Sequence, residues 1–310
     1  MKKILLTALF TACLPLSLHG TLAAASGATL QPDPARLQLA SVHALVAPLN
    51  PGTPVYTKFA DRPAPIASIT KLMTAMVVLD SGLPLDEWLP IVEREDDPPK
   101  NAFSRIRPGS EAQRGDLLRI TLMSSENLAA YVLARHHPGG RDAFIAAMNQ
   151  KARELGMTQT RFVDPSGLWP ENHASATDLL KMVRAAYAYS EIRAMSTGSN
   201  QRVHFRSPRY SLDFGNTNAL VHSSRWKVSL SKTGYLTEAG RCLVMVADVG
   251  GEPTVMVLLD SFGSRTPLGD AGRIRGWLET GSSGAVAGAA LEYERSRSAA
   301  LAGVGAVAEP

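Results

Sequence analysis

The stretch Ala67-Ser68-Ile69-Thr70-Lys71 opens the apolar run Leu72-Met73-Thr74-Ala75-Met76-Val77-Val78-Leu79. This pattern predicts a buried helix over residues 66–79, which ends where Asp80-Ser81-Gly82 begins. Ser68 and Lys71 are three positions apart, so their side chains lie on one face of the helix, about one turn from each other. An unprotonated amine in that place can accept the proton of the hydroxyl and make the serine a nucleophile.

The beginning of this helix adds a second favourable feature for such chemistry. The free N–H groups and partial positive charge of a helix N-terminus favour negative charge that develops nearby. The motif alone is weak, because Ser-x-x-Lys is common by chance and the chain contains another at Ser229-Leu-Ser-Lys232. The rest of the chain must therefore decide between the two.

The N-terminus has the organisation of an export signal. Met1-Lys2-Lys3 is charged, the run from Ile4 to Ala12 is apolar, and Leu22-Ala23-Ala24-Ala25 offers small residues for cleavage. We interpret residues 1–25 as a secretory signal peptide, too short to be a convincing membrane span, and expect a periplasmic protein.

Removal of the signal peptide would change both the net charge and the number of cysteines. The chain has 310 residues and a formal net charge of +4, which falls to +2 without Lys2 and Lys3. We therefore expect no nucleic-acid partner. Cys13 leaves with the signal, so Cys242 is alone in an apolar run and is expected to be a buried structural thiol.

The remaining chain alternates in its structural preference. Short β-like runs occur at both ends, and residues from about 80 to 190 have a helical pattern. The expected segments are a linker at 26–38, a β-hairpin from Leu39–Leu49 and Val55–Phe59, an α lobe at about 80–190, C-terminal strands at Arg202–Arg206, Arg225–Leu230, Cys242–Val249 and Thr254–Asp260, a closing helix at Ala271–Leu278, and a flexible Ala/Gly-rich tail at 281–310.

This order predicts one α+β domain at 39–280. The two β ends are expected to share an antiparallel sheet with flanking helices, and the α block is expected to form a lobe inserted against that sheet. Clefts between such lobes are favoured places for ligand sites.

Two further short motifs are expected to lie at the cleft between the two lobes. Ser125-Glu126-Asn127 lies between two predicted helices, and Lys232-Thr233-Gly234 ends a predicted strand. The Ser125 hydroxyl with a nearby lysine can relay a proton to a leaving amine, and the Asn127 amide can hold a substrate amide. Lys232 and Thr233 can hold a carboxylate, while Gly234 lets a substrate backbone approach the strand.

An acyl transfer also needs oxyanion donors and a neutral base. The backbone N–H groups of Ser68 and Tyr235 are candidate oxyanion donors, each worth about 3 kcal/mol of barrier. A second lysine nearby and partial burial would both lower the pKa of Lys71. We expect Lys232 to face Ser68 and help to keep Lys71 neutral.

The three motifs, in the order SxxK, SxN and KTG, resemble those of the penicillin-binding protein and serine β-lactamase superfamily. Within it, the chain is most similar to the low-molecular-mass D-Ala-D-Ala peptidases, and among these to the endopeptidase branch of penicillin-binding protein 7 type. The similarity spans about Leu39 to Leu278 and is carried by Ala67-Ser-Ile-Thr-Lys71-Leu-Met-Thr-Ala, Leu122-Met-Ser-Ser-Glu-Asn127, Asp164-Pro-Ser-Gly-Leu168, Lys232-Thr-Gly-Tyr235 and Glu238-Ala-Gly-Arg-Cys-Leu243.

The resemblance implies a two-lobed DD-peptidase fold and a role for each motif. Ser68 would be the acyl-enzyme nucleophile and Lys71 its base. Ser125 and Asn127 would line the cleft from the α lobe, and the strand at 232–234 would dock the substrate. The implied substrate is the peptide stems of cross-linked peptidoglycan, with β-lactam antibiotics as covalent inhibitors at Ser68.

Three alternatives remain. A class A β-lactamase would need Glu-x-x-Leu-Asn, which the sequence lacks. A D-Ala-D-Ala carboxypeptidase often carries an extra C-terminal domain and an amphipathic anchor, whereas the residues after Leu278 have no basic amphipathic face, so we expect no stable membrane anchor. An inactive wall-binding homologue is disfavoured because every polar motif residue is present. No metal and no cofactor are predicted, and Asn218 receives no role.

Overall fold

The computed structural model describes residues 32–95 and 103–305. The predicted signal peptide and the first part of the predicted linker lie outside the described residues. No helix among the described residues is long and apolar enough to cross a membrane.

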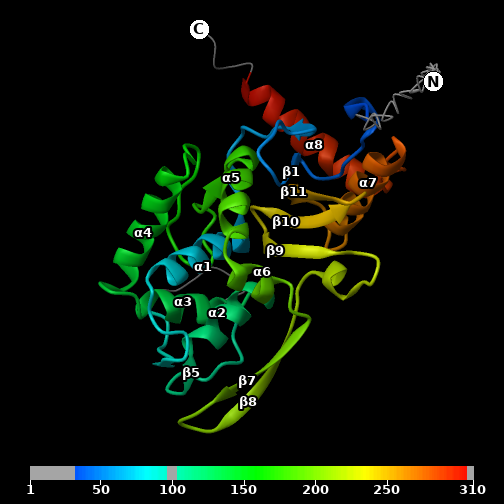
Figure 1. Ribbon diagram of the computed structural model, residues 1–310. Helices are drawn as coiled ribbons and strands as arrows, with labels where there is room; N and C mark the ends of the chain where they lie inside the picture. Colours follow the sequence, from blue (N-terminus) through cyan, green and yellow to red (C-terminus); the bar gives the residue numbers. More distant parts are fainter. Residues whose placement is uncertain (1–31, 96–102, 306–310) are drawn as a thin grey trace, which may run out of the picture. The chain divides into compact units, whose positions relative to one another are not determined.

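A five-stranded antiparallel sheet joins the two ends of the chain, as predicted (Figure 1). Its order is β2-β1-β11-β10-β9, so the N-terminal hairpin pairs with the C-terminal strands, with Leu45 opposite Val257. The strands are β1 (His43–Pro48), β2 (Tyr56–Lys58), β9 (Val228–Leu236), β10 (Gly240–Val249) and β11 (Glu252–Ser261).

The central strands are buried on both faces because helices cover both sides of the sheet. Alternate residues of β10 divide between two apolar cores: Val244 and Val246 face the α lobe, while Leu243 and Met245 share a core with Trp277. That second core lies beneath α7 (Thr266–Thr280), which confirms and extends the predicted closing helix.

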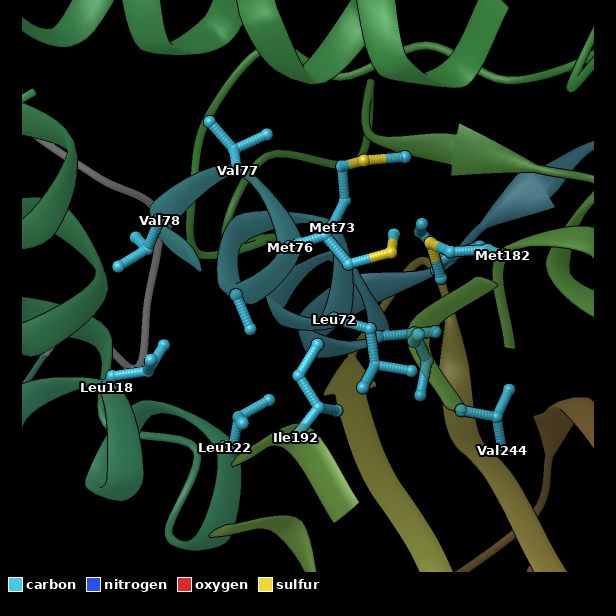
Figure 2. Packing of buried hydrophobic residues seen from close by; sticks show 14 of the residues in the cluster. Leu72, Met73, Met76, Val77, Val78, Leu118, Leu122, Met182, Ile192 and Val244 are labelled. Atoms are coloured by element: carbon cyan, nitrogen blue, oxygen red, sulfur yellow. The ribbon is translucent and has the colours of Figure 1, made fainter. Parts of the chain in front are cut away.

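The helix predicted over residues 66–79 lies at the centre of the α lobe. It is observed as a 3₁₀ turn, η2 (Ala67–Thr70), followed by α1 (Lys71–Asp80). Side chains of α1 such as Leu72 and Met76 lie against Leu122 and Ile192 from neighbouring helices, and Val244 of the sheet is close by (Figure 2). The apolar run is therefore buried because other elements surround it.

The remaining α-lobe elements connect α1 to the sheet, and the Ser175 side chain caps α5. They are β3 (Ala64–Pro65), β4 (Trp88–Pro90), β5 (Glu111–Gln113), α2 (Arg114–Met123), α3 (Asn127–Arg135), α4 (Gly140–Glu154), β6 (His173–Ala174), α5 (Ala176–Tyr187) and α6 (Ser190–Ser196), with short 3₁₀ turns η1 (Pro34–Arg36) and η3 (Ala219–His222).

One predicted strand lies in a different sheet. The run at Arg202–Arg206 overlaps β7 (Asn200–Phe205), which pairs with β8 (Tyr210–Gly215) in a hairpin outside the main sheet. The hairpin buries Val203, Phe205 and Phe214 and leaves its polar side chains exposed. An alternating sequence predicts such a strand but not the sheet to which it belongs.

The C-terminal segment differs from the expected flexible tail, because residues Gly288–Gly305 form the helix α8. The segment has few large apolar residues, and it is held by polar contacts instead. Tyr293 Oη donates to Asp260 at 2.6 Å, Arg297 Nε donates to the same carboxylate at 2.8 Å, and Lys58 pairs with Glu294 at 2.6 Å. Composition predicted a flexible tail because the segment has few large apolar residues. The partners that hold α8 are distant in sequence, so composition could not reveal them.

Candidate active site

Ser68 lies in the η2 turn immediately before α1 and is half-buried. The residue before it, Ala67, has a φ of +46°, a left-handed conformation that is unusual for a residue with a Cβ. A Cβ on Gly167 would lie 1.9 Å from the carbonyl oxygen of Ala67, so only glycine fits there. The strained turn is therefore enclosed by a second segment that approaches it closely.

Lys71 is completely buried and reaches Ser68 directly. Its Nζ lies 2.7 Å from Ser68 Oγ, 2.7 Å from Asn127 Oδ1 and 2.6 Å from the carbonyl oxygen of Ser166. Two of these three partners are carbonyl-type oxygens that can only accept hydrogen bonds. They take both hydrogens of a neutral amine, which leaves its lone pair facing the Ser68 hydroxyl.

The surroundings also favour that neutral amine. Burial lowers the pKa of Lys71 to about 7, against the opposing effect of the Asp164 and Glu126 carboxylates. At neutral pH a substantial share of the molecules therefore have an amine ready to accept a proton. The sequence predicted this pair, and the structure brings it together.

A buried loop, residues 164–172, supplies the Ser166 carbonyl oxygen and was not predicted as part of the site. Asp164 accepts hydrogen bonds from the Ser166 and Gly167 backbone N–H groups at 2.8 and 3.1 Å, and also from Ser166 Oγ and Asn172 Nδ2. These bonds hold the loop in one conformation against η2. The signal that could have found it is Asp-Pro-Ser-Gly, an acceptor followed by turn residues.

Ser125 and Lys232 form a second hydroxyl–amine pair. Ser125 lies between α2 and α3 with a φ of +60°, and Lys232 Nζ donates to its Oγ at 2.9 Å and to the Thr233 carbonyl oxygen at 2.6 Å. Burial and the Lys71 cation hold the pKa of Lys232 well below its ordinary value. The expected repulsion between the two lysines thus acts mainly on Lys232.

Strand β9 brings Thr233, Gly234 and Tyr235 to the same place. It is the edge strand of the sheet, and a Cβ on Gly234 would lie 3.1 Å from the backbone nitrogen of Ser68. The absence of a side chain there lets β9 pass close to the η2 turn. Tyr235, the next residue, is 42% exposed, so the position after Gly234 is open to a ligand.

Two residues that precede β9 complete the arrangement. Thr217 Oγ1 lies 2.6 Å from Thr233 Oγ1, and sequence reasoning missed this contact. The buried Asn218, which received no role, donates from Nδ2 to Ser231 Oγ at 2.8 Å and accepts from the Leu220 N–H at 3.0 Å. Asn218 therefore holds β9 in position beside the site.

The other candidate residues have structural contacts. Glu126 turns back to cap α3, accepting from the Ala129 N–H at 2.7 Å, and burial raises its pKa. Cys242 is buried and burial raises the pKa of its thiol to about 12, as expected for a structural cysteine. Among the described residues, no group of His, Cys, Asp and Glu could hold a metal ion.

This chain is similar to known proteins in both sequence and fold. A D-alanyl-D-alanine endopeptidase of Pseudomonas aeruginosa is 48% identical over 264 residues, 85% of each chain, and one of Escherichia coli is 45% identical over 272 residues, 88% of each chain. A mutant of a Streptomyces DD-transpeptidase has a TM-score of 0.70 and 29% identity, covering 78% of this chain and 98% of its own. Penicillin-binding protein D2 of Listeria monocytogenes, solved with ampicillin bound, has a TM-score of 0.68, with 27% identity over 79% of this chain and 98% of its own.

The family comparison covers most of the chain. The D-alanyl-D-alanine carboxypeptidase family matches residues 28–263, which include all three motifs and the loop at 164–172. The chain belongs to this family, as a low-molecular-mass penicillin-binding protein of the type that its motifs predicted.

Proposed function

We propose that the protein is a penicillin-sensitive serine DD-peptidase of the periplasm, which cleaves D-alanyl cross-links of peptidoglycan through an acyl-enzyme on Ser68. The observation that carries this function is the 2.7 Å contact between Ser68 Oγ and the buried Lys71 amine, whose two hydrogens are taken by carbonyl-type oxygens. That geometry makes a serine nucleophile without any histidine.

The acylation step follows from this geometry. Lys71 accepts the hydroxyl proton while Ser68 Oγ attacks the carbonyl carbon of the scissile D-alanyl bond. The negative charge moves to the carbonyl oxygen, where the N–H groups of Ser68 and Tyr235 stabilise it. The C–N bond then breaks, the Ser125–Lys232 pair delivers a proton to the departing amine and is recharged by the proton that Lys71 took, and an ester on Ser68 remains. Water attacks that ester while Lys71, neutral again, accepts its proton and returns it to Ser68 Oγ, which restores the serine.

The substrate is held on both sides of Ser68. Lys232 and Thr233 bind its carboxylate from β9, and Gly234 leaves room for its backbone. Asn127 accepts a hydrogen bond from Lys71 at its Oδ1, and in this proposal its side-chain amide also orients the substrate peptide. A β-lactam ring presents the same carbonyl and carboxylate, so it acylates Ser68 in the same way.

The endopeptidase assignment over carboxypeptidase rests on the relatives. The two at 45–48% identity are both named D-alanyl-D-alanine endopeptidase, and this chain matches them over 85–88% of their length. The carboxypeptidase DacF of Bacillus subtilis is 29% identical, and this chain covers 55% of it. Export by the N-terminal segment places the enzyme where its substrate is.

Mass spectrometry of digested muropeptides tests this function. We expect purified protein to convert cross-linked dimers into monomers, and fluorescent penicillin to label it covalently. Ser68→Ala should abolish both, whereas Ser229→Ala, in the other Ser-x-x-Lys, should abolish neither. Loss of terminal D-Ala with dimers intact would point to a carboxypeptidase. Rapid multiple turnover of penicillin would point to a β-lactamase.

A further inference from the structure

The β7–β8 hairpin has two different faces and begins at the catalytic site. Val203, Phe205 and Phe214 are buried on one side, while Arg202 and His204 are exposed on the other. Its inner end is tied to the site, because Ser124 Oγ donates to the Gly215 carbonyl oxygen at 2.8 Å and Thr217 contacts Thr233. The hairpin is thus continuous with the strand that docks the substrate.

The outer end of the hairpin is fixed as well. Backbone hydrogen bonds of 2.8 and 3.1 Å join Arg206 to Glu111 of β5 in both directions. Six residues of extended strand span about 20 Å, so the hairpin carries its surface about that far from the site. Figure 1 shows the hairpin as a long two-stranded element beside β5.

Arginines gather along this element. Arg105 lies over the Phe214 ring at 5.1 Å, Arg107 over the Tyr210 ring at 4.8 Å and Arg206 over the Trp88 ring at 4.3 Å. The hairpin itself adds Arg202 and Arg209, both exposed. Stacking on rigid rings holds the first three guanidinium groups in place, which lowers the entropy lost when they bind an anion.

The acidic residues nearby neutralise only part of this charge. Asp213 pairs with Arg202 at 2.7 Å, and Glu111 pairs with Arg206. Of the other acids nearby, Asp116 lies near both Arg119 and His204 and Glu87 pairs with Arg114, so each of these two acids is itself matched by a cation. We call the surface formed by these five arginines the basic hairpin surface: Arg105, Arg107, Arg202, Arg206 and Arg209. Asp213 and Glu111 compensate two of the five positive charges, so three remain uncompensated among the described residues of this surface.

We propose that this surface binds the anionic stem peptides of peptidoglycan strands beyond the bond being cut. The inference rests on the proposed function, which supplies the polymer. Each stem that is not cross-linked ends in a carboxylate, and guanidinium groups bind carboxylates with two parallel hydrogen bonds. Small substrates fill only the site at Ser68, whereas a polymer that enters it extends over the hairpin. The surface therefore selects polymeric wall over isolated peptides.

A binding experiment on full-length protein tests the surface without catalysis. In a Ser68→Ala background, which leaves the wall uncut, we compare the triple variant R107Q/R202Q/R209Q with the control R153Q/R265Q/R295Q. Both lose three exposed positive charges, but the control loses them from other elements. Binding to purified insoluble sacculi is measured by co-sedimentation at low and at high salt, and thermal unfolding checks that each variant folds.

At about 20 mM salt, where surface charges are weakly screened, we expect the hairpin variant to bind sacculi at least about tenfold more weakly than its parent. The control should stay within about twofold, and about 500 mM salt should remove most of the difference between hairpin variant and parent. Equal losses in both triple variants, or no loss in either, would overturn the proposal. So would hairpin-dependent binding to phosphatidylglycerol vesicles with none to sacculi. Failure of the DD-peptidase function would appear instead as absent penicillin labelling of the Ser68 protein.

Discussion

The catalytic cluster around Lys71 and the cluster that holds α8 both contain cationic side chains, but the two clusters surround the positive charge with opposite kinds of partner. Around α8, two cations meet carboxylates: Arg297 binds Asp260 and Lys58 binds Glu294. In the catalytic cluster, Lys71 and Lys232 contact only hydroxyl and carbonyl-type oxygens among the described residues.

The pKa values follow this difference. Burial lowers the pKa of Lys71 to about 7. Burial also acts to lower the pKa of Arg297, but the hydrogen bond to Asp260 and the attraction of the Asp260 and Tyr293 charges together outweigh it and raise that pKa. A paired cation stays charged and holds structure, while a buried unpaired amine gives up its proton and becomes a base. The comparison indicates that the proposed role of Lys71 as a base depends on its being buried without a carboxylate in contact with it.

The largest expected effect comes from removing the base. Lys71→Met should lower the rate of acylation by penicillin about 10²- to 10⁴-fold, because no group then accepts the Ser68 proton. The exposed Lys227→Met serves as the control and should leave that rate unchanged. In the wild type, protonation of the amine below pH 7 should lower the rate about tenfold per unit, with a plateau above. An acid limb near the ordinary lysine pKa would contradict the assignment.

A smaller but severe effect should follow from crowding the turn that carries Ser68. In Gly167→Ala the new Cβ would meet the Ala67 carbonyl oxygen at 1.9 Å, at a backbone φ of +77°. We expect a loss of at least about 3 kcal/mol in the free energy of unfolding, together with slow acylation.

A second glycine variant serves as the control that separates the steric clash with Ala67 from the cost of placing alanine at a positive φ. Gly250 has a φ of +62° and nothing within 4 Å of its Cβ position, so Gly250→Ala should cost only about 1–2 kcal/mol and leave acylation intact. Urea unfolding and penicillin acylation rates measure both effects. Equal losses in the two variants would mean that the contact with Ala67 is unimportant.

The smallest expected effect lies in the paired cluster. Arg297→Gln removes the charged hydrogen bond to Asp260, which is 3% exposed, and should lower the free energy of unfolding by about 1–2 kcal/mol. Acylation should not change, since Arg297 contacts none of the site residues. Arg295→Gln, an exposed neighbour on α8, should have no effect on stability. A loss of acylation in Arg297→Gln would show that the two clusters are coupled.

Much of the site could be predicted from the sequence because its parts are short and local. Ser68 and Lys71 lie within one turn of each other, and each of the other two motifs lies within three residues. The family and the shared antiparallel sheet are confirmed, since an order of β, α and β segments leaves few arrangements that bury every apolar face.

The tertiary structure decided what those short patterns leave open. Ser166, 95 positions from Lys71, supplies an acceptor that orients the buried amine, and Asp164 fixes the position of Ser166. The β7–β8 hairpin lies outside the main sheet, and α8 is held by the Asp260 carboxylate, more than 30 positions away, rather than by its own composition. Hydrogen bonds and charge pairs between distant segments have no periodicity in sequence, whereas helix faces and motif spacings do. The sequence by itself thus determined which groups are the candidates for the chemistry, and only folding decided their protonation and their surroundings.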